Sequence, residues 1–162
     1  GLSNTFHGRD LFAPAAAHLA AGVVLEEFGK AVEKPVMLRE PVLRATDGRL
    51  QGEVVHIDHF GSAVTSIGQL RWVKDSRLSL TPRFGSVPEL SFKTEDTMVL
   101  YDDRILTGIH RTYGEVGQGE VLALVGSSGF LELAINGGSY AAAFDVNVGD
   151  RVQLQFEQTG QN

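Results

Sequence analysis

The sequence contains no cysteine, a single tryptophan and no apolar run near the ~20 residues that a membrane-spanning helix requires. The lack of cysteine excludes disulfides, thiolate metal ligands and cysteine nucleophiles, which is typical of a cytoplasmic protein. Positive charge is also scarce, because 14 Lys and Arg stand against 20 Asp and Glu, for a net charge of −6. No basic face is therefore available for a phosphate backbone, and we expect neither nucleic acid nor a membrane as a partner.

What the sequence does contain is typical of a globular protein. Its 162 residues are 43% hydrophobic and 21% charged, which is enough to bury a core within one ordinary domain. The chain begins with Gly1 rather than Met, and no charged and apolar leader precedes it. We therefore expect a processed, tagged or truncated chain.

The residue pattern of the sequence changes once, near Lys34 and Pro35, from one typical of helices to one typical of strands. Before this point, Leu11 and Leu19 lie on one face at helical spacing, and Gly22 is a typical helix stop. Pro14 is compatible with this helix only in its first turn. A second amphipathic stretch, residues 23–32, predicts a short helix that turns its apolar side chains toward a core.

From residue 35 onward the sequence favours strands. The segment "PVMLREPVLRA" is followed by Asp47-Gly48, a strong hairpin signal, and then by the alternating "LQGEVVHIDHFG". We predict further strands in "AVTSIGQLRWV", "MVLYDD", "ILTGIHRTY", "VLALVG", "FLELAI", "SYAAAF" and "RVQLQF". Many short strands separated by glycine-containing turns predict a mainly β fold, a β-barrel-like domain over residues 35–162 preceded by one or two helices in residues 1–34.

The first candidate site is "TFHGRD", residues 5–10, just before the predicted helix. Asp10 could stabilise the helix N-terminus as a cap and through the helix dipole, and Arg9 and Asp10 could form a plain surface pair. Alternatively, His7 exchanges a proton near neutral pH while Gly8 lets a ligand approach the backbone. The residues alone leave both interpretations open.

The second candidate site is "VHIDHFGSAVTSI", residues 55–67. Strand alternation predicts His56, Asp58 and Phe60 on one face. Asp58 could bind an ammonium group or two ribose hydroxyls, with Phe60 as a flat apolar wall. Asp58 could equally form an Asx turn at the strand end. A metal site begun by His56 and Asp58 has no third ligand placed by spacing, so we expect no metal.

The third candidate site is "GSSGFLELAINGGSYAAAF", residues 126–144. The turn from Gly126 to Gly129 could offer backbone N–H groups and two hydroxyls to a ligand, and residues 136–138 a second bare backbone segment. Glycine-rich turns also serve simply to join strands. The segment is not a phosphate-binding P-loop, because the lysine of that motif is missing.

In their residues and their order, these segments resemble the S-adenosyl-L-methionine (SAM) hydroxide adenosyltransferase family, whose members are relatives of the SAM-dependent chlorinases and fluorinases. The resemblance spans almost the whole chain and rests on "TFHGRDLFAPAAAHLAAG", "HIDHFGSAVTSI", "GSSGFLELAINGGSYAAA" and "VGDRV". It implies that water attacks the ribose C5′ of SAM and releases methionine and adenosine, without a cofactor. Methionine departs neutral, so the reaction needs an oriented, partly deprotonated water in line with the C–S bond.

The resemblance also implies a role for each site residue. His7 matches the catalytic histidine, and since the halogenases commonly have tyrosine there, it favours hydroxide over halide transfer. Thr5, Phe6 and Gly8 would line the pocket beside the reacting carbon.

The barrel residues would hold the remainder of SAM. Asp58 would bind the methionine ammonium and Ser127 the methionine carboxylate. Phe60 would border the nucleoside, and Tyr113 would stack on adenine. The contacts to the adenine edge would come from Ser62 and from the backbone around Asn136 and Gly137.

Two departures from the family pattern carry expectations. Ser62 and Ser66 stand where the family usually has asparagine, so we expect a weaker or water-bridged contact to adenine. The family's α/β N-terminal domain supplies a catalytic aspartate and arginine and a ribose-binding carboxylate, and we expect it to be missing except for its tail and linker helices in residues 1–34. In the family the active site lies between two subunits of a trimer. We therefore expect the isolated chain to be a nucleoside-binding half-site without activity, and the alternative of a halogenase fragment remains.

Overall fold

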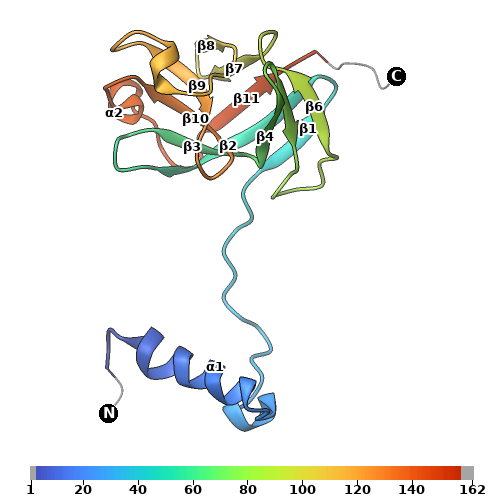
Figure 1. Cartoon of the computed structure of the whole chain (residues 1–162), viewed down its shortest axis with the longest axis vertical. Helices are drawn as coiled ribbons and strands as arrows, with labels where there is room; N and C mark the ends of the chain where they lie inside the picture. The colour runs from blue at the N-terminus through green and yellow to red at the C-terminus, as the bar shows by residue number, and fades with distance from the viewer. Residues whose placement is uncertain (1–2, 158–162) are drawn as a thin grey trace. The chain divides into compact units, whose positions relative to one another are not determined.

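The structure is a computed structural model that describes residues 3–157 and contains two compact units, Gly1–Leu38 and Arg39–Asn162 (Figure 1). In the first unit, a π-helical turn, η1 (Gly8–Phe12), continues into helix α1 (Ala13–Ala20). Pro14 lies in the first turn of α1, as predicted, and Gly22 follows the helix with a φ of 90°. This positive φ is favourable for glycine and ends the helix.

Asp10 does not cap this helix. It lies inside η1, where its Oδ2 accepts a hydrogen bond from the backbone N–H of Ser3 (3.0 Å) and its carboxylate pairs with Arg9. The predicted surface pair of Arg9 and Asp10 is therefore confirmed, and the prediction that Asp10 caps the helix is wrong. Arg9 and the Ser3 N–H hold the pKa of Asp10 below its usual value.

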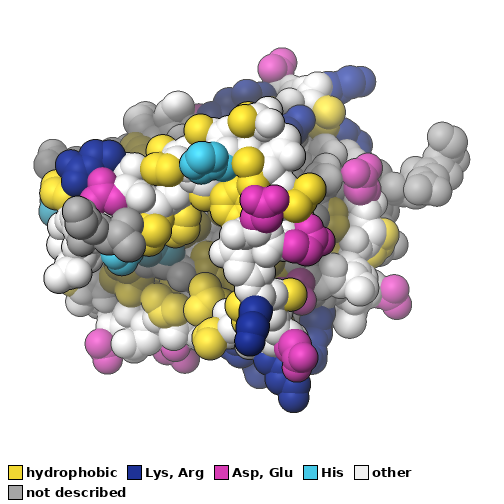
Figure 2. Space-filling model, turned by 90° about the horizontal axis from the view of Figure 1, so that it is seen from below, with side chains coloured by type: hydrophobic (Ala, Val, Ile, Leu, Met, Phe, Trp, Pro, Cys, Tyr) yellow, Lys and Arg dark blue, Asp and Glu magenta, His cyan; other side chains and the backbone are white. Residues whose placement is uncertain are grey.

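The helix predicted over residues 23–32 is also wrong. Only one 3₁₀ turn forms, η2 (Leu25–Phe28), and Val24, Leu25 and Phe28 are exposed. Gly22 and Gly29 both have positive φ, and the segment between them is too short to sustain an α-helix on its own. Exposed hydrophobic side chains among charged ones are visible on the face shown in Figure 2.

The second unit is mainly β, as the sequence predicts, and forms a nearly closed antiparallel barrel (Figure 1). Its 8-stranded sheet has the order β8-β7-β11-β2-β3-β10-β9, with β1 paired to β2. The chain after β8 returns to β9 through a bridge between His110 and Leu124, which brings the two ends of the sheet together. The strands are β1 (Leu43–Thr46), β2 (Arg49–Ile57), β3 (Ala63–Gly68), β7 (Met98–Tyr101), β8 (Arg104–Thr107), β9 (Val121–Val125), β10 (Phe130–Ile135) and β11 (Arg151–Gln155).

A 3-stranded sheet, β4-β5-β6, completes the strands of this unit. It consists of β4 (Leu70–Lys74), β5 (Arg77–Leu80) and β6 (Leu90–Lys93). The single strand predicted over "AVTSIGQLRWV" is thus two strands in two sheets, and β5 and β6 had not been predicted. The hairpin at Asp47-Gly48 is confirmed, with Gly48 at a φ of 66° between β1 and β2.

Two predicted strands are wrong. "SYAAAF" forms a short helix, α2 (Tyr140–Phe144), because Ser139 caps it by accepting a hydrogen bond from the Ala142 N–H (3.1 Å) and alanine favours helix. Most of "PVMLREPVLRA" has no regular structure, and only its end enters β1. The segment's two prolines remove backbone donors that a strand would need.

The barrel core is apolar and continuous. Leu50, Val54, Leu133 and Leu154 are fully buried between the strands, and Tyr140 of α2 packs on Phe144 with ring centroids 4.7 Å apart. This packing fixes α2 and the turns beside it against β10. Over residues 3–157, no helix is long and apolar enough to cross a membrane.

A polar and aromatic cleft at the end of β10

A cleft of about 940 Å³ opens in the barrel unit where the turns after β2, β9 and β10 meet. The loop that contains the 3₁₀ turn η3 (Tyr113–Glu115) forms another of its walls. All seven site residues predicted within the barrel line this cleft, although they come from four separate segments: Asp58, Phe60, Ser62, Tyr113, Ser127, Asn136 and Gly137.

Asp58 organises the turn between β2 and β3. Its Oδ1 accepts hydrogen bonds from the backbone N–H groups of Phe60 (2.9 Å) and Ser62 (2.8 Å). The Asx turn considered from the sequence is therefore present. Because β2 ends at Ile57, it includes His56 but neither Asp58 nor Phe60, and the predicted strand alternation of these three residues is wrong. Within residues 3–157, Oδ2 of Asp58 accepts no hydrogen bond, so one oxygen remains for a ligand.

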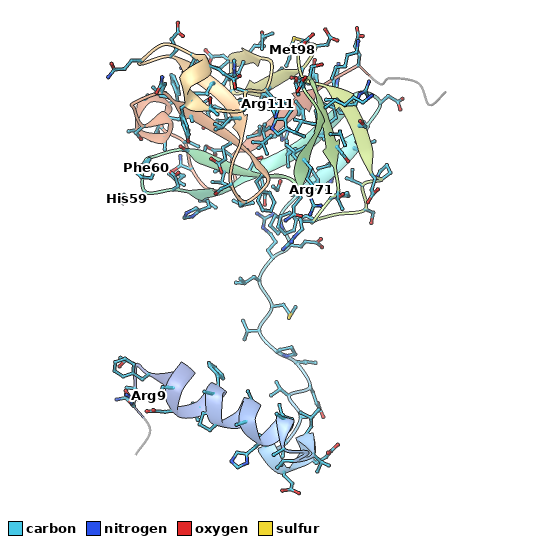
Figure 3. All side chains as sticks on the ribbon, viewed as in Figure 1. Arg9, His59, Phe60, Arg71, Met98 and Arg111 are labelled. Carbon is cyan, nitrogen blue, oxygen red and sulfur yellow. The ribbon has the colours of Figure 1, made fainter. Side chains whose placement is uncertain are left out.

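Phe60 lies at the tip of the same turn, beside His59 (Figure 3). Its side chain is 78% exposed although it is fully apolar. Gly61 follows with a φ of 87°, and a Cβ there would collide with Ser139. Gly61 therefore lets the turn approach the start of α2, which sets the position of Phe60 at the cleft.

Tyr113 reaches the cleft from the opposite wall. Its hydroxyl lies 3.3 Å from Ser62 Oγ. The loop that carries Tyr113 is fixed by Glu115, whose Oε1 accepts from the N–H groups of Arg111 (3.1 Å) and Thr112 (3.2 Å). The other oxygen of Glu115 lies 3.2 Å from His110 Nδ1.

The two glycine-rich turns behave differently. Ser127 is exposed on the turn between β9 and β10, and its hydroxyl bonds to none of residues 3–157. Asn136, by contrast, donates its N–H to Glu120 O (2.9 Å) and accepts from the Gly119 N–H (2.7 Å). Both polar groups of the Asn136 backbone are therefore engaged within the protein. The backbone of Gly137 forms no such bond within the described chain, so it is the part of this segment that remains available to a ligand.

Glu132 is a cleft residue that the sequence reasoning missed. It lies on β10 between the buried Leu131 and Leu133, and its side chain therefore points away from the core into the cleft. Burial, together with the nearby carboxylate of Asp58, raises its pKa above the usual value. A charged residue at the centre of an otherwise apolar strand, "FLELAI", was the signal that could have found it.

Arg111 and Thr112 also line the cleft without having been predicted. The guanidinium of Arg111 packs over the ring of Trp72, 4.0 Å from its centroid, and donates to the carbonyls of Lys74 (3.2 Å) and Asp75 (3.1 Å). Arg111, labelled in Figure 3, thus ties the η3 loop to the turn between β4 and β5.

Ser66 does not reach the cleft. It is fully buried, accepts a hydrogen bond from the Glu53 N–H (3.0 Å) and donates to the carbonyl of Val42. The contact to adenine that was expected for Ser62 and Ser66 together can therefore come only from Ser62. Ser66 instead holds β2 and the segment before β1 against β3.

The N-terminal cluster lies in the other unit. Thr5, Phe6, His7 and Gly8 are exposed at the start of η1, and the guanidinium of Arg9 packs over the ring of Phe6, 4.8 Å from its centroid. His7 contacts no hydrogen-bond partner among residues 3–157. Within the same residues, no three His, Asp or Glu side chains gather in a way that could hold a metal ion.

A second cavity, of about 660 Å³, lies beside β7 and β11. In this cavity the Tyr101 hydroxyl donates to Asp150 Oδ2 (2.8 Å), which also accepts from the Asn147 N–H (2.7 Å). It contains none of the predicted site residues. The cleft at β10, which contains all the predicted barrel residues and the free Oδ2 of Asp58, is the better candidate for a ligand site.

Comparison with known protein families identifies the family of this chain. The family model described as the SAM hydroxide adenosyltransferase C-terminal domain matches residues 52–153, and the model of the same family's N-terminal domain matches residues 1–29. The chain belongs to the SAM hydroxide adenosyltransferase family. The resemblance inferred from the four sequence segments is thereby confirmed, and the cleft lies within the matched C-terminal domain.

Several relatives have curated names. The (R)-S-adenosyl-L-methionine hydrolase of Thermus thermophilus is 37% identical over 150 residues, which are 93% of this chain and 49% of that protein. The hydrolase of the same name from Salinispora tropica is 36% identical over 155 residues, 94% of this chain and 51% of the relative. A fluorinase from Actinopolyspora mzabensis is 32% identical over 154 residues, 93% of this chain and 48% of the relative.

Two solved structures resemble this chain over most of its length. An uncharacterised conserved protein from Thermotoga maritima matches 95% of this chain and 54% of its own, with 27% identity and a TM-score of 0.60. A conserved hypothetical protein from Thermus thermophilus matches 91% of this chain and 52% of its own, with 34% identity and a TM-score of 0.58. The chain spans about half the length of the curated relatives it matches.

Proposed function

We propose that this protein takes part in the hydrolysis of SAM to adenosine and L-methionine. The observation that carries the proposal is the cleft, in which a free carboxylate oxygen of Asp58, the exposed ring of Phe60 and the hydroxyls of Tyr113 and Ser127 face one space. SAM has an ammonium, an aromatic base and a carboxylate. A carboxylate oxygen can bind the first, an aromatic ring the second and a hydroxyl the third. The curated hydrolase names of the relatives support the same substrate.

The cleft would hold SAM by its two ends. Asp58 binds the ammonium and Ser127 the carboxylate of the methionine portion. Tyr113 and Phe60 hold the adenosine portion between apolar surfaces, and Ser62 and the Gly137 backbone contact the adenine edge. No cofactor is needed, because the leaving sulfur is already positively charged in SAM and departs neutral.

The chemical step would be a substitution at saturated carbon. A water oxygen attacks ribose C5′ as the C5′–S bond breaks, the bonding pair goes to sulfur, and the water proton goes to a base. His7 is the proposed base, with Thr5, Phe6 and Gly8 beside the reacting carbon. The cleft contributes by orienting SAM so that C5′ faces the incoming water in line with sulfur.

His7 has no orienting partner within residues 3–157, and an unoriented histidine is a poor base. We therefore propose that the 162-residue chain alone binds nucleosides but does not turn SAM over. In this proposal a complete site forms in a homotrimer of the complete gene product, where residues from a neighbouring subunit complete the environment of His7.

The proposal is tested by binding and turnover together. Adenosine binding to the 162-residue chain is measured by calorimetry. Adenosine formation from SAM is followed by chromatography, on this chain and on the complete product of its gene. Adenosine binding by the chain, with turnover by the complete product that His7→Ala abolishes, supports the proposal. Turnover unaffected by His7→Ala contradicts the role of His7.

A halogenase is the second candidate, because fluorinases are also among the relatives. His7 argues against it, since the resemblance associates tyrosine at this position with halide transfer. The same assay separates the two functions when fluoride or chloride is added. A halide-dependent 5′-halogenated adenosine in place of adenosine would identify a halogenase.

A further inference from the structure

The cleft contains two carboxylates and no positive partner for either. Asp58 and Glu132 both line it, and neither forms an ion pair with any of residues 3–157. The one arginine in the lining, Arg111, directs its guanidinium to Trp72, to two backbone carbonyls and to the carboxylate of Asp75 (3.9 Å) instead. Carboxylates withdrawn from water without a counter-ion are costly, so their retention here requires an explanation.

The surrounding backbone accommodates Glu132. Leu131 and Leu133 face the core, which leaves the intervening side chain directed to the cleft. Gly126, at the turn after β9, lies directly against the Glu132 carboxylate, and a Cβ at Gly126 would overlap Oε1. The absence of a side chain at Gly126 thus leaves the space that the Glu132 carboxylate occupies.

The electrostatic environment of Glu132 is simple. The strands on either side of it, β3 and β9, carry no ionisable side chain, and α2 carries only the buried Tyr140. The other ionisable groups of the cleft are Asp58, Arg111 and Tyr113. Burial and the carboxylate of Asp58 both raise the pKa of Glu132. A cation placed between the two carboxylates would relieve this repulsion.

The turn at Asp58 limits what that residue can do alone. Its Oδ1 is already occupied by the N–H groups of Phe60 and Ser62, so only Oδ2 remains for a ligand. An alkyl ammonium has three N–H donors, all of which need acceptors once the group leaves water. One free oxygen of Asp58 therefore does not satisfy the ammonium that the proposed function assigns to it.

On the basis of the proposed function, we infer that Glu132 is a second binding residue for the substrate ammonium, which it holds together with Asp58. Glu132 supplies the acceptor that Asp58 lacks, and the pair provides the negative charge that an amino acid ammonium requires. The pair also discriminates between ligands, because a nucleoside without an amino acid portion gains nothing from Glu132.

The test compares two neutral thioether nucleosides by calorimetry. S-adenosylhomocysteine carries the ammonium, and 5′-methylthioadenosine lacks the amino acid portion. We expect Glu132→Gln to lower the affinity for S-adenosylhomocysteine by about tenfold, the usual effect of losing a charge-assisted hydrogen bond. The affinity for 5′-methylthioadenosine should be unchanged. Glu89→Gln makes the same charge change at an exposed residue outside the cleft and should alter neither.

The pH dependence of the affinity for S-adenosylhomocysteine is a second measurement, which a purely structural role of Glu132 would not change. Acid protonates Glu132, so wild-type affinity for S-adenosylhomocysteine should begin to fall at a higher pH than that of Glu132→Gln. Thermal unfolding confirms that the variant is folded. Suppose that wild type binds 5′-methylthioadenosine. The inference is then overturned if Glu132→Gln leaves the affinity for S-adenosylhomocysteine unchanged, or lowers the affinities for both ligands equally. If wild type binds no nucleoside, the proposed function itself fails.

Discussion

The hydroxyl of Tyr113 lies 3.3 Å from Ser62 Oγ, which joins two walls of the cleft that are 51 residues apart in the sequence. Ser62 is buried in the turn that Asp58 organises, and Tyr113 lies on the loop that Glu115 fixes. The contact therefore sets the distance between the two turns that the ligand must fill.

Tyr113 should contribute through its ring more than through its hydroxyl. Tyr113→Ala removes the stacking surface and should weaken adenosine binding by about tenfold or more, since a base stacked on an aromatic ring gains on the order of 1–3 kcal/mol. Tyr113→Phe keeps the ring and loses only the Ser62 contact, so its effect should be small. Calorimetry with adenosine distinguishes the two. Equal losses in both variants would show that the ring does not stack on the base.

Glu115 should act on binding through the loop. Glu115→Ala removes the acceptor for two backbone N–H groups, and we expect a loss of about 1 kcal/mol in the free energy of unfolding. Adenosine affinity should also fall, because Tyr113 loses its support. Urea unfolding and calorimetry measure the two effects. Glu95→Ala, outside the cleft, is the control, and a variant of Glu115 with unchanged affinity would refute this role.

Ser62 and Ser66 should have opposite effects when changed to alanine. Ser66→Ala leaves the buried N–H of Glu53 and the partly buried carbonyl of Val42 without this partner. It should therefore lower the free energy of unfolding by about 1–3 kcal/mol. Its adenosine affinity should be unchanged. Ser62→Ala should lower adenosine affinity with little change in stability. Each variant serves as the control for the other, and a reversed outcome would contradict the assignment of Ser62 to the cleft.

Glu132 should lower the stability of the free protein as pH rises. Its pKa in the folded protein is raised, so folding favours the protonated form and the free energy of unfolding falls as pH rises above the ordinary value for glutamate. Glu132→Gln cannot ionise and should therefore unfold at a higher temperature than wild type at neutral pH, with the difference vanishing in acid. Thermal unfolding across pH measures this. A variant less stable than wild type at neutral pH would show that the carboxylate is structurally satisfied.

Most of the barrel was predictable because its strands carry local signals. The Asp47-Gly48 hairpin and the alternating apolar residues of β2 and β11 depend on neighbouring residues and are present in the sequence. The family resemblance then brought together cleft residues such as Asp58 and Ser127, which no local pattern connects. Their convergence is a property of the sheet order, in which β3 lies between β2 and β10.

The misses have physical reasons. "SYAAAF" has only a few residues, and its helix depends on the Ser139 cap and on the packing of Tyr140 against the core. Ser62 and Ser66 match similar positions of the family motif, but Ser62 lies in the turn before β3, at the cleft, whereas Ser66 lies within β3 and is buried. The backbone of Asn136 is used by the loop at Gly119, a contact between separate segments that only the folded chain reveals.

The most direct test of the account is hydrolysis of SAM by the complete gene product in water enriched in oxygen-18. If water attacks the ribose C5′, the adenosine formed carries the label at its 5′-oxygen, the methionine carries none, and His7→Ala abolishes both products. Adenosine without label, or no adenosine from a protein that still binds it, would contradict the proposed reaction.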